Sequence, residues 1–137
     1  MDSSFPTKSS GAIKASLARG LLRSLSSASE HIQATALVTH DGLIVASVME
    51  KGIDVDRFGA MCASLLALAN SAAKEVNRGE LKQVILDGVY GPMLLTRAGE
   101  AGVLAVAAAA AANLGRVILD ARNTARALSE LGSFDNA

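Results

Sequence analysis

Apolar positions divide the second half of the chain into three short runs separated by turn residues. The runs are 81–86, 90–96 and 102–108, and the links between them, 87–88 and 97–100, contain Gly. Runs of five to seven residues with such short links are typical of antiparallel strands, because a parallel return needs a dozen residues or more. We therefore predict a three-stranded meander as the organising element of the fold.

A second pair of apolar runs, 34–39 and 43–47, flanks the dipeptide Asp41-Gly42. Asp-Gly tolerates the positive backbone angles of a two-residue hairpin turn, so these runs predict an antiparallel hairpin. His40 lies in the turn. Because no Cys or second His stands at ligand spacing beside it, we interpret His40 as a turn residue and not as a metal ligand.

Helical periodicity marks a segment near each end of the chain. The first begins at Ser9 or Ser10, either of which can cap a helix. Its apolar stripe is one residue wide, which predicts a surface helix that docks with one side. The stripe consists of Ile13, Leu17, Leu21, Leu25 and Ala28. The last helix is predicted from Leu114 to Gly132, a stop signal. Its outer side carries Arg116, Arg122 and Arg126, which we interpret as a solvated basic face, with a binding patch as the alternative.

The longest helix is predicted from Asp54 to Gly79, and two of its faces can dock. One face is apolar and contains Phe58, Met61, Cys62, Leu65, Ala69, Ala72 and Val76. The opposite face is small and weakly polar, unlike a solvated helix; it contains Asp56, Ala60, Ala63, Ser64, Ala67, Asn70, Ser71, Lys74 and Arg78. About 25 residues extend roughly 37 Å, whereas strands of six or seven residues are about 20 to 23 Å long. We therefore expect this face to make a second contact; a solvated Ala- and Ser-rich face is the alternative.

The segment 107–112 is six consecutive Ala residues, and Ala is the best helix former. A helix beginning near Glu100 would absorb this segment and remove the fifth strand. We favour a strand through Ala108, because Val103, Leu104 and Val106 continue the meander. Small side chains there would let helices pack closely on both faces of a central strand.

Length and composition favour one soluble domain. The 137 residues suffice for a single core. We expect a disordered tail over 1–10, the domain over 11–132 and a loose C-terminal tail over 133–137. Thirteen Lys and Arg balance thirteen Asp and Glu, so no net field favours nucleic acid. Cys62 is the lone cysteine, which fits a reducing compartment. Without a signal peptide or a membrane-length apolar run, we expect a cytoplasmic protein with no membrane insertion.

No familiar catalytic motif is present. The chain lacks a phosphate-binding Gly-x-x-x-x-Gly-Lys-Ser/Thr loop, a Gly-x-Ser-x-Gly nucleophile turn, and the His-Glu-x-x-His and Cys-x-x-Cys metal patterns. Asp54 and Asp56 form a carboxylate pair, which a helix start explains. We therefore expect a non-enzymatic protein without a cofactor or metal.

Several short strings carry a family resemblance. They are THDGLIVAS at 39–47, the helix end Arg78-Gly79-Glu80, LKQVILDG and MLLTRAG in the meander, and NLG at 113–115. Over residues 11–131 the chain resembles the Roadblock family, named for a dynein light chain, and in particular its bacterial and archaeal MglB-like members. The resemblance implies an α/β (α+β) fold with one five-stranded, mostly antiparallel sheet and three helices in the order α-β-β-α-β-β-β-α. Tyr90-Gly91-Pro92 departs from the expected pattern, and Pro92 predicts a bulge or an edge position.

The resemblance also implies a homodimer whose 81–86 strands pair edge to edge while the two long helices pack together. The expected dimer-interface residues are Ala60, Ala63, Ser64, Ala67, Ser71, Leu81, Gln83, Val84 and Ile85. MglB-like proteins regulate small Ras-like GTPases, which makes such a GTPase the expected partner. The expected partner-binding residues are Asp56, Arg57, Asn70, Lys74 and Arg78. The alternatives are a scaffold subunit of a larger complex and a small-ligand sensor.

Overall fold

The computed structural model describes residues 10–134 as three helices and a five-stranded sheet in the predicted order. The elements are α1 (Ser10–Ala28), β1 (Ile32–Val38), β2 (Ile44–Val48), α2 (Val55–Glu75), β3 (Gln83–Gly88), β4 (Gly91–Arg97), the 3₁₀ turn η1 (Gly99–Ala101), β5 (Val103–Ala108) and α3 (Leu114–Ser129). The predicted N-terminal tail lies outside the described residues except for Ser10, which opens α1.

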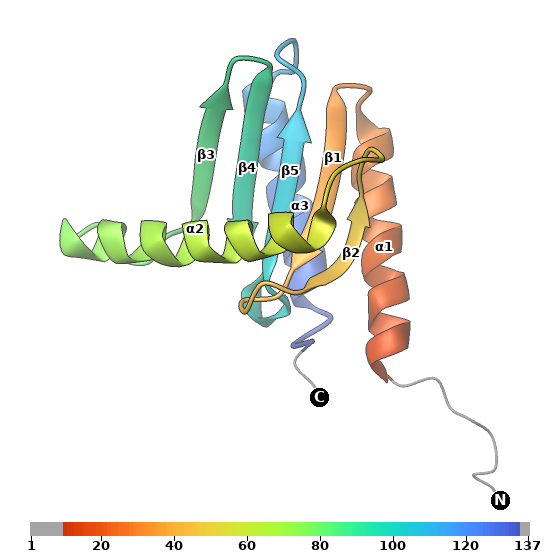
Figure 1. The fold of residues 1–137 in the computed structure, drawn as a ribbon, viewed down its shortest axis with the longest axis horizontal. Coiled ribbons are helices and arrows are strands. Elements are labelled where there is room, and N and C mark those ends of the chain that lie inside the picture. Colours follow the sequence, from red (N-terminus) through yellow and green to blue (C-terminus); the bar gives the residue numbers. More distant parts are fainter. Residues whose placement is uncertain (1–9, 135–137) are drawn as a thin grey trace, which may run out of the picture.

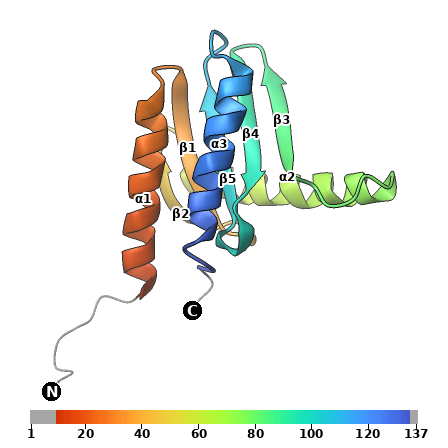
Figure 2. The same cartoon turned by 180° about the vertical axis from the view of Figure 1, so that it is seen from behind.

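The sheet order is β2-β1-β5-β4-β3, and every neighbouring pair is antiparallel. Helices α1 and α3 cover one face, and α2 crosses the other (Figures 1 and 2). The segment 103–108 is a strand, as favoured above, and it is the central one. Its small residues, such as Ala105 and Ala108, are buried between helices on both faces.

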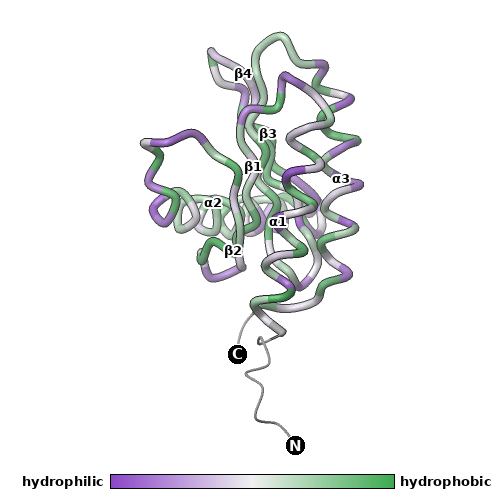
Figure 3. The backbone as a smooth tube through the Cα atoms, turned by 90° about the vertical axis from the view of Figure 1, so that its right-hand side faces the viewer, coloured by the Kyte–Doolittle hydropathy of each residue, from purple (hydrophilic) through white to green (hydrophobic). Residues whose placement is uncertain are grey.

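Each face of the sheet has its own core. Leu22 of α1, Leu104 of β5 and Leu128 of α3 are fully buried in the larger core under α1 and α3. Cys62 and Leu66 of α2 belong to a smaller core on the other face. In the hydropathy colouring the sheet strands are mainly green and α3 alternates between green and purple (Figure 3), as expected for a helix with one buried side. Several apolar residues that pack against the smaller core, including Leu65 and Val84, are only partly buried.

Two of the hairpin turns differ in detail from their predictions. The first is a three-residue loop, because the Thr39 N–H donates to the Leu43 carbonyl over 2.8 Å and Gly42 takes a φ of +96°. In the second, Asp87 and Gly88 belong to β3, and Val89-Tyr90 form the turn. Of the two alternatives predicted for Pro92, the structure has no bulge, since the β3–β4 register runs without a shift. Pro92 lies at the start of β4, before the pairing with β5 begins at Met93.

The apolar stripe predicted for α1 is rotated by about one residue. Ala18, Leu22 and Leu25 face the core, whereas Ile13 and Leu17 are half-exposed. The helix contacts both the sheet and α3, so its apolar residues divide between two directions. The predicted stripe assumed a single docking partner, and it therefore lies between the side of α1 that contacts the sheet and the side that contacts α3.

The ordered domain extends two residues past its predicted C-terminal boundary. The ammonium group of Lys14 donates to the Ser133 carbonyl over 3.1 Å and lies 5.8 Å from the centre of the Phe134 ring. Phe134 also packs against the larger core. The rest of the predicted loose tail, 135–137, lies outside the described residues.

Burial of Cys62 makes a testable link between stability and pH. Desolvation raises the pKa of the Cys62 thiol from 9.0 to about 11. The unfolded thiol therefore loses its proton first, and the free energy of unfolding should fall as pH rises from 9 to 11, by about 2 to 3 kcal/mol in total. Urea unfolding across this range measures the slope. Cys62→Ala should remove that contribution; equal slopes for the two proteins would contradict the prediction.

Candidate interaction surface

Helix α2 is longer than the sheet face on which it lies. Figure 1 shows α2 crossing the strands and continuing past β3. Its 21 residues extend about 31 Å, whereas four strand spacings across a five-stranded sheet amount to about 19 Å. Because the helix runs across the strands, sheet width and not strand length sets its support. The C-terminal part of α2, about 12 Å or eight residues, therefore overhangs the sheet.

The N-terminal half of α2 is held close to the sheet. The side chain of Asp54 caps the helix by accepting from the Arg57 N–H over 3.1 Å. Gly59 permits this packing, because a Cβ there would lie 2.8 Å from the Gly42 carbonyl oxygen. Cys62 and Leu66 are buried one and two turns further along.

The predicted sheet-facing side of α2 is partly wrong. Met61 and Val76 are 60% and 61% exposed, and Ala72 is also exposed. Cys62 and Leu66 face the sheet, so Met61 lies about 100° around the helix from that direction. The apolar residues of α2 thus cover two adjacent sides, of which only one is buried in a single chain.

The uncovered apolar side of α2 adjoins uncovered residues of β3. Met61, Leu65 and Leu68 share a helix side at spacings of four and three residues, and Leu68 is 72% exposed. Leu65 and Val84 pack against the same core, which places Val84 and, two residues on, Leu86 on the α2 side of the sheet. We call Met61, Leu65, Leu68, Val84 and Leu86 the α2–β3 apolar surface.

Strand β3 ends the sheet beside this surface. It pairs only with β4 among the described residues, so one row of its backbone N–H and C=O groups has no strand partner. The other edge strand, β2, is shorter and contacts α1. An exposed, regular edge next to exposed apolar side chains is suited to pairing with another chain.

The expected dimer-interface residues fall in two places. Ala60, Ser64, Ala67 and Ser71 are exposed on the small-residue side of α2, and Ala63 is half-buried against the β1–β2 loop. Ala67 and Ser71 line a hollow with Arg97 and Val103 of the sheet. On β3, Gln83, Val84 and the preceding Leu81 are half-buried, and Ile85 is exposed. The β3 residues lie on the free edge strand.

The expected partner-binding residues do not form one patch in a single chain. Asp56 and Arg57 lie in the first turn of α2, and Lys74 lies in its last turn, about 27 Å away at 1.5 Å per residue. The Arg78 guanidinium donates to the nearby Val76 carbonyl over 3.2 Å. Asn70 has a structural contact, because its side-chain oxygen accepts from the Leu81 N–H over 3.0 Å and joins α2 to the start of β3.

No group of three or more His, Cys, Asp and Glu side chains within residues 10–134 is arranged to hold a metal ion. In the same part of the chain, no helix is long and apolar enough to cross a membrane. The prominent features of the surface are the overhang of α2, the exposed residues of the α2–β3 apolar surface and the free edge of β3.

Comparison with known proteins decides the family. The family model described as the Roadblock/LC7 domain matches residues 12–108. The chain belongs to the Roadblock/LC7 family. This Roadblock/LC7 chain is 31% identical over 102 residues to the uncharacterized protein MJ1340 of Methanocaldococcus jannaschii, and the matched region covers 74% of this chain and 89% of that protein.

Solved structures show that this Roadblock/LC7 chain has an MglB-like fold. An MglB with a tetrameric arrangement superposes with a TM-score of 0.80 at 19% identity, covering 96% of this chain and 97% of that one. Myxococcus xanthus MglB superposes with a TM-score of 0.78 at 18% identity, covering 85% and 88%. The family model spans the elements from α1 through β5, so it includes both α2 and the β3 edge.

Sequence reasoning missed Met61 and Leu68 as surface residues. One signal was available: the apolar positions of α2 occupy more than the single stripe that a helix lying on one sheet requires. A helix that overhangs its sheet and carries apolar residues over more of its circumference than the sheet covers is expected to contact a second partner. For this Roadblock/LC7 chain, the second contact expected of α2 therefore has a better candidate in its apolar side than in its small-residue side.

Proposed function

We propose that this protein is a non-enzymatic homodimeric regulator that binds a small Ras-like GTPase. The observation that carries the proposal is the overhang of α2 together with the α2–β3 apolar surface, whose Met61, Leu68 and Leu86 are exposed beside a free strand edge. The MglB-like fold supports the same conclusion, because the MglB resemblance implies a GTPase partner. One of the similar MglB proteins forms a tetrameric arrangement, which supports self-association through a surface of this fold.

The dimer that fits this surface has a two-fold axis at the β3 edge. Antiparallel pairing of two β3 strands makes a continuous ten-stranded sheet from two five-stranded ones. The overhanging part of each α2 then lies over the other protomer's sheet, and the two helices run antiparallel side by side. In this arrangement Leu65 and Leu68 of each helix meet near the axis and cover Val84 and Leu86.

The same arrangement makes a composite surface for the GTPase. Antiparallel helices place the first turn of one α2, with Asp56 and Arg57, beside the last turn of the other, with Lys74, and the segment after it, with Arg78. The small side chains of α2, including Ala60 and Ala67, then lie on the open side of the helix pair. A partner can approach this face closely because nothing bulky projects from it.

The proposal predicts nucleotide-dependent binding. We would titrate the protein with purified small GTPases of its own organism, each loaded with GDP or a non-hydrolysable GTP analogue, by calorimetry. We expect at least one GTPase to bind, with affinity differing about tenfold or more between nucleotide states. Arg57→Glu with Lys74→Glu should weaken this binding by about tenfold or more, since rim charges contribute to association and specificity.

A matched control tests whether the effect is local. Arg19→Glu with Arg23→Glu makes the same charge change at two exposed positions of α1, on the other face of the sheet, and should leave binding unchanged. Absence of binding to every GTPase in both nucleotide states would refute the GTPase proposal. Binding with unchanged GTP hydrolysis at saturation would instead favour the scaffold alternative.

A further inference from the structure

A basic groove lies on the face of the sheet opposite α2, between α3 and the β3–β4 end of the sheet. Figure 2 shows that α3 leaves β3 uncovered on this face. The groove has a volume of about 400 Å³. Its lining includes Lys82, Arg97, Arg122 and Arg126 and contains no acidic residue. Four cations around one hollow stand out in a chain whose net charge is zero.

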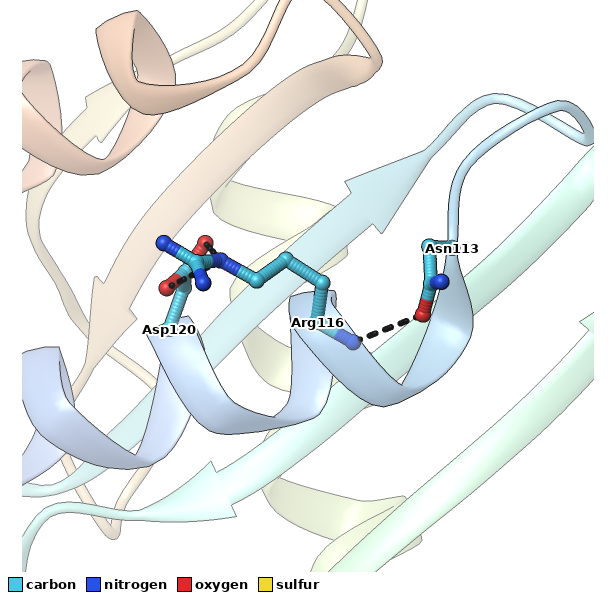
Figure 4. A network of polar contacts seen from close by, with 3 residues as sticks. All are labelled: Asn113, Arg116 and Asp120. Atoms are coloured by element: carbon cyan, nitrogen blue, oxygen red, sulfur yellow. Dashed lines mark hydrogen bonds and ion pairs between the residues drawn. The ribbon is translucent and has the colours of Figure 1, made fainter.

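The charge of this groove is not neutralised within the described chain. The only ion pair between side chains of residues 10–134 joins Arg116 to Asp120, with 3.3 Å between nitrogen and oxygen (Figure 4). Arg116 is thus matched by an acid one turn along α3, whereas Arg122 and Arg126 pair with no acid in that part of the chain. Arg126 donates to the neutral Asn123 side chain, over 3.4 Å. Glu100 lines an adjoining hollow with Arg97 without pairing to it.

The strand side of the groove carries unused hydrogen-bonding groups. Thr96 lines the groove and is 6% exposed, yet its buried hydroxyl has no hydrogen-bond partner among the described residues. Its cross-strand neighbour Gln83 has a buried side-chain oxygen that is also without a partner in that part of the chain. Buried polar groups are normally satisfied. The Thr96 hydroxyl is able to donate to an anionic ligand in the groove, whereas Gln83 lies beside Thr96 but not among the lining residues.

The spacing of the cations identifies the kind of ligand. Arg122 and Arg126 are one helical turn apart, so their Cβ atoms are separated by about 6 Å. Alternate side chains of an extended segment are separated by about 6.6 Å on one face, and guanidinium groups bind carboxylates through paired, charge-assisted hydrogen bonds. We propose that this groove binds an acidic, extended segment of a partner protein, with alternate carboxylates on Arg122 and Arg126.

This second site is independent of the surface proposed for the GTPase. Helix α2 and the groove lie on opposite faces of the sheet, and Arg122 and Arg126 are both on the groove side, although Arg97 also lines a hollow beside α2. In a β3-paired dimer the two grooves would lie on the same face, one beside each α3. The protein would then join a GTPase on one face to an acidic protein on the other.

The test uses a fluorescein-labelled peptide of alternating Glu and Ser, with fluorescence anisotropy at low and at physiological salt. The native chain should bind the peptide, and affinity should fall as salt rises because the contacts are ionic. Arg122→Glu with Arg126→Glu should weaken binding by at least about tenfold, which corresponds to about 1.4 kcal/mol. Arg122→Gln with Arg126→Gln should give a smaller loss. Arg19→Glu with Arg23→Glu is the matched control and should bind like the native chain.

Three outcomes would overturn the proposal: no binding by the native chain, equal weakening by the α1 control, or equal binding of the matching Gln-Ser peptide. A further titration uses inorganic pyrophosphate as the ligand. If pyrophosphate binds while the Glu-Ser peptide does not, the groove is a small-anion site and the proposed occupant is wrong. No GTPase is present in these titrations, so their failure is distinguishable from failure of the proposed regulatory function.

Discussion

Leu68→Glu is expected to convert the protein from a dimer to a monomer. Leu68 is 72% exposed in the single chain, so the substitution leaves the folded protomer undisturbed. In the proposed dimer it places two symmetry-related carboxylates in an apolar contact without partners, and burying an unpaired charge costs several kcal/mol. The dissociation constant should rise by at least about a hundredfold, or about 2.7 kcal/mol. Light scattering over a range of concentrations should show a native mass of two chains of 14.0 kDa and a variant mass of one.

Ala60→Glu with Ala67→Glu is the informative comparison for that experiment. It adds carboxylates to the same helix, but on its exposed small-residue side, about 80 to 100° around the helix from Leu68. We expect this variant to remain a dimer and to lose GTPase binding. If it dissociates while Leu68→Glu does not, the helices pair through their small-residue face. A native monomer at every concentration would contradict the dimer and the composite surface that depends on it.

The strands could be predicted because their signals are local. Apolar runs joined by Gly-containing links define the meander, and even at 103–108, where the Ala run left a helix as the alternative, Val103, Leu104 and Val106 indicated the strand that the structure contains. The pairing of β1 with β5 has no local signal, since these strands are far apart in sequence. The exact turns also depended on backbone geometry that composition does not specify, such as the three-residue loop closed by Thr39 and Leu43.

Helix orientation was harder to predict because periodicity does not identify the partner. In α2, Cys62 and Met61 belong to neighbouring apolar rows, and only the sheet decides which row is buried. The basic groove was harder still. Lys82 and Arg97 come from the β3–β4 hairpin and its flanks, and Arg122 and Arg126 come from α3, so only the tertiary fold brings them together. Three arginines on one helix were visible in the sequence, but the unpartnered Thr96 beneath them was not.

Gly102→Ala is expected to destabilise the fold strongly, although it adds only one methyl group. Gly102 has a φ of +134°, and a Cβ there would lie 2.0 Å from the Val38 carbonyl oxygen. That oxygen belongs to the last residue of β1, and Gly102 immediately precedes β5. Relief of the clash therefore requires movement of the backbone where the two central strands begin to pair. We expect the free energy of unfolding to fall by roughly 3 kcal/mol or more, as for other substitutions that combine backbone strain with core disruption.

Gly20→Ala is the matched control, because it adds the same methyl group at a site with no constraint. Gly20 lies within α1, has no positive φ, and nothing lies within 4 Å of the position of an added Cβ. Ala should stabilise the helix there by about 0.5 to 1 kcal/mol. Urea unfolding of both variants at one protein concentration measures the two effects, since in the proposed dimer the apparent stability depends on concentration. If Gly102→Ala lowers the free energy of unfolding while Gly20→Ala raises it, the loss at Gly102 comes from the close approach of the β1 and β5 backbones and not from replacing glycine as such. A Gly102→Ala protein as stable as the native chain would mean that β1 and β5 approach less closely than the structure describes.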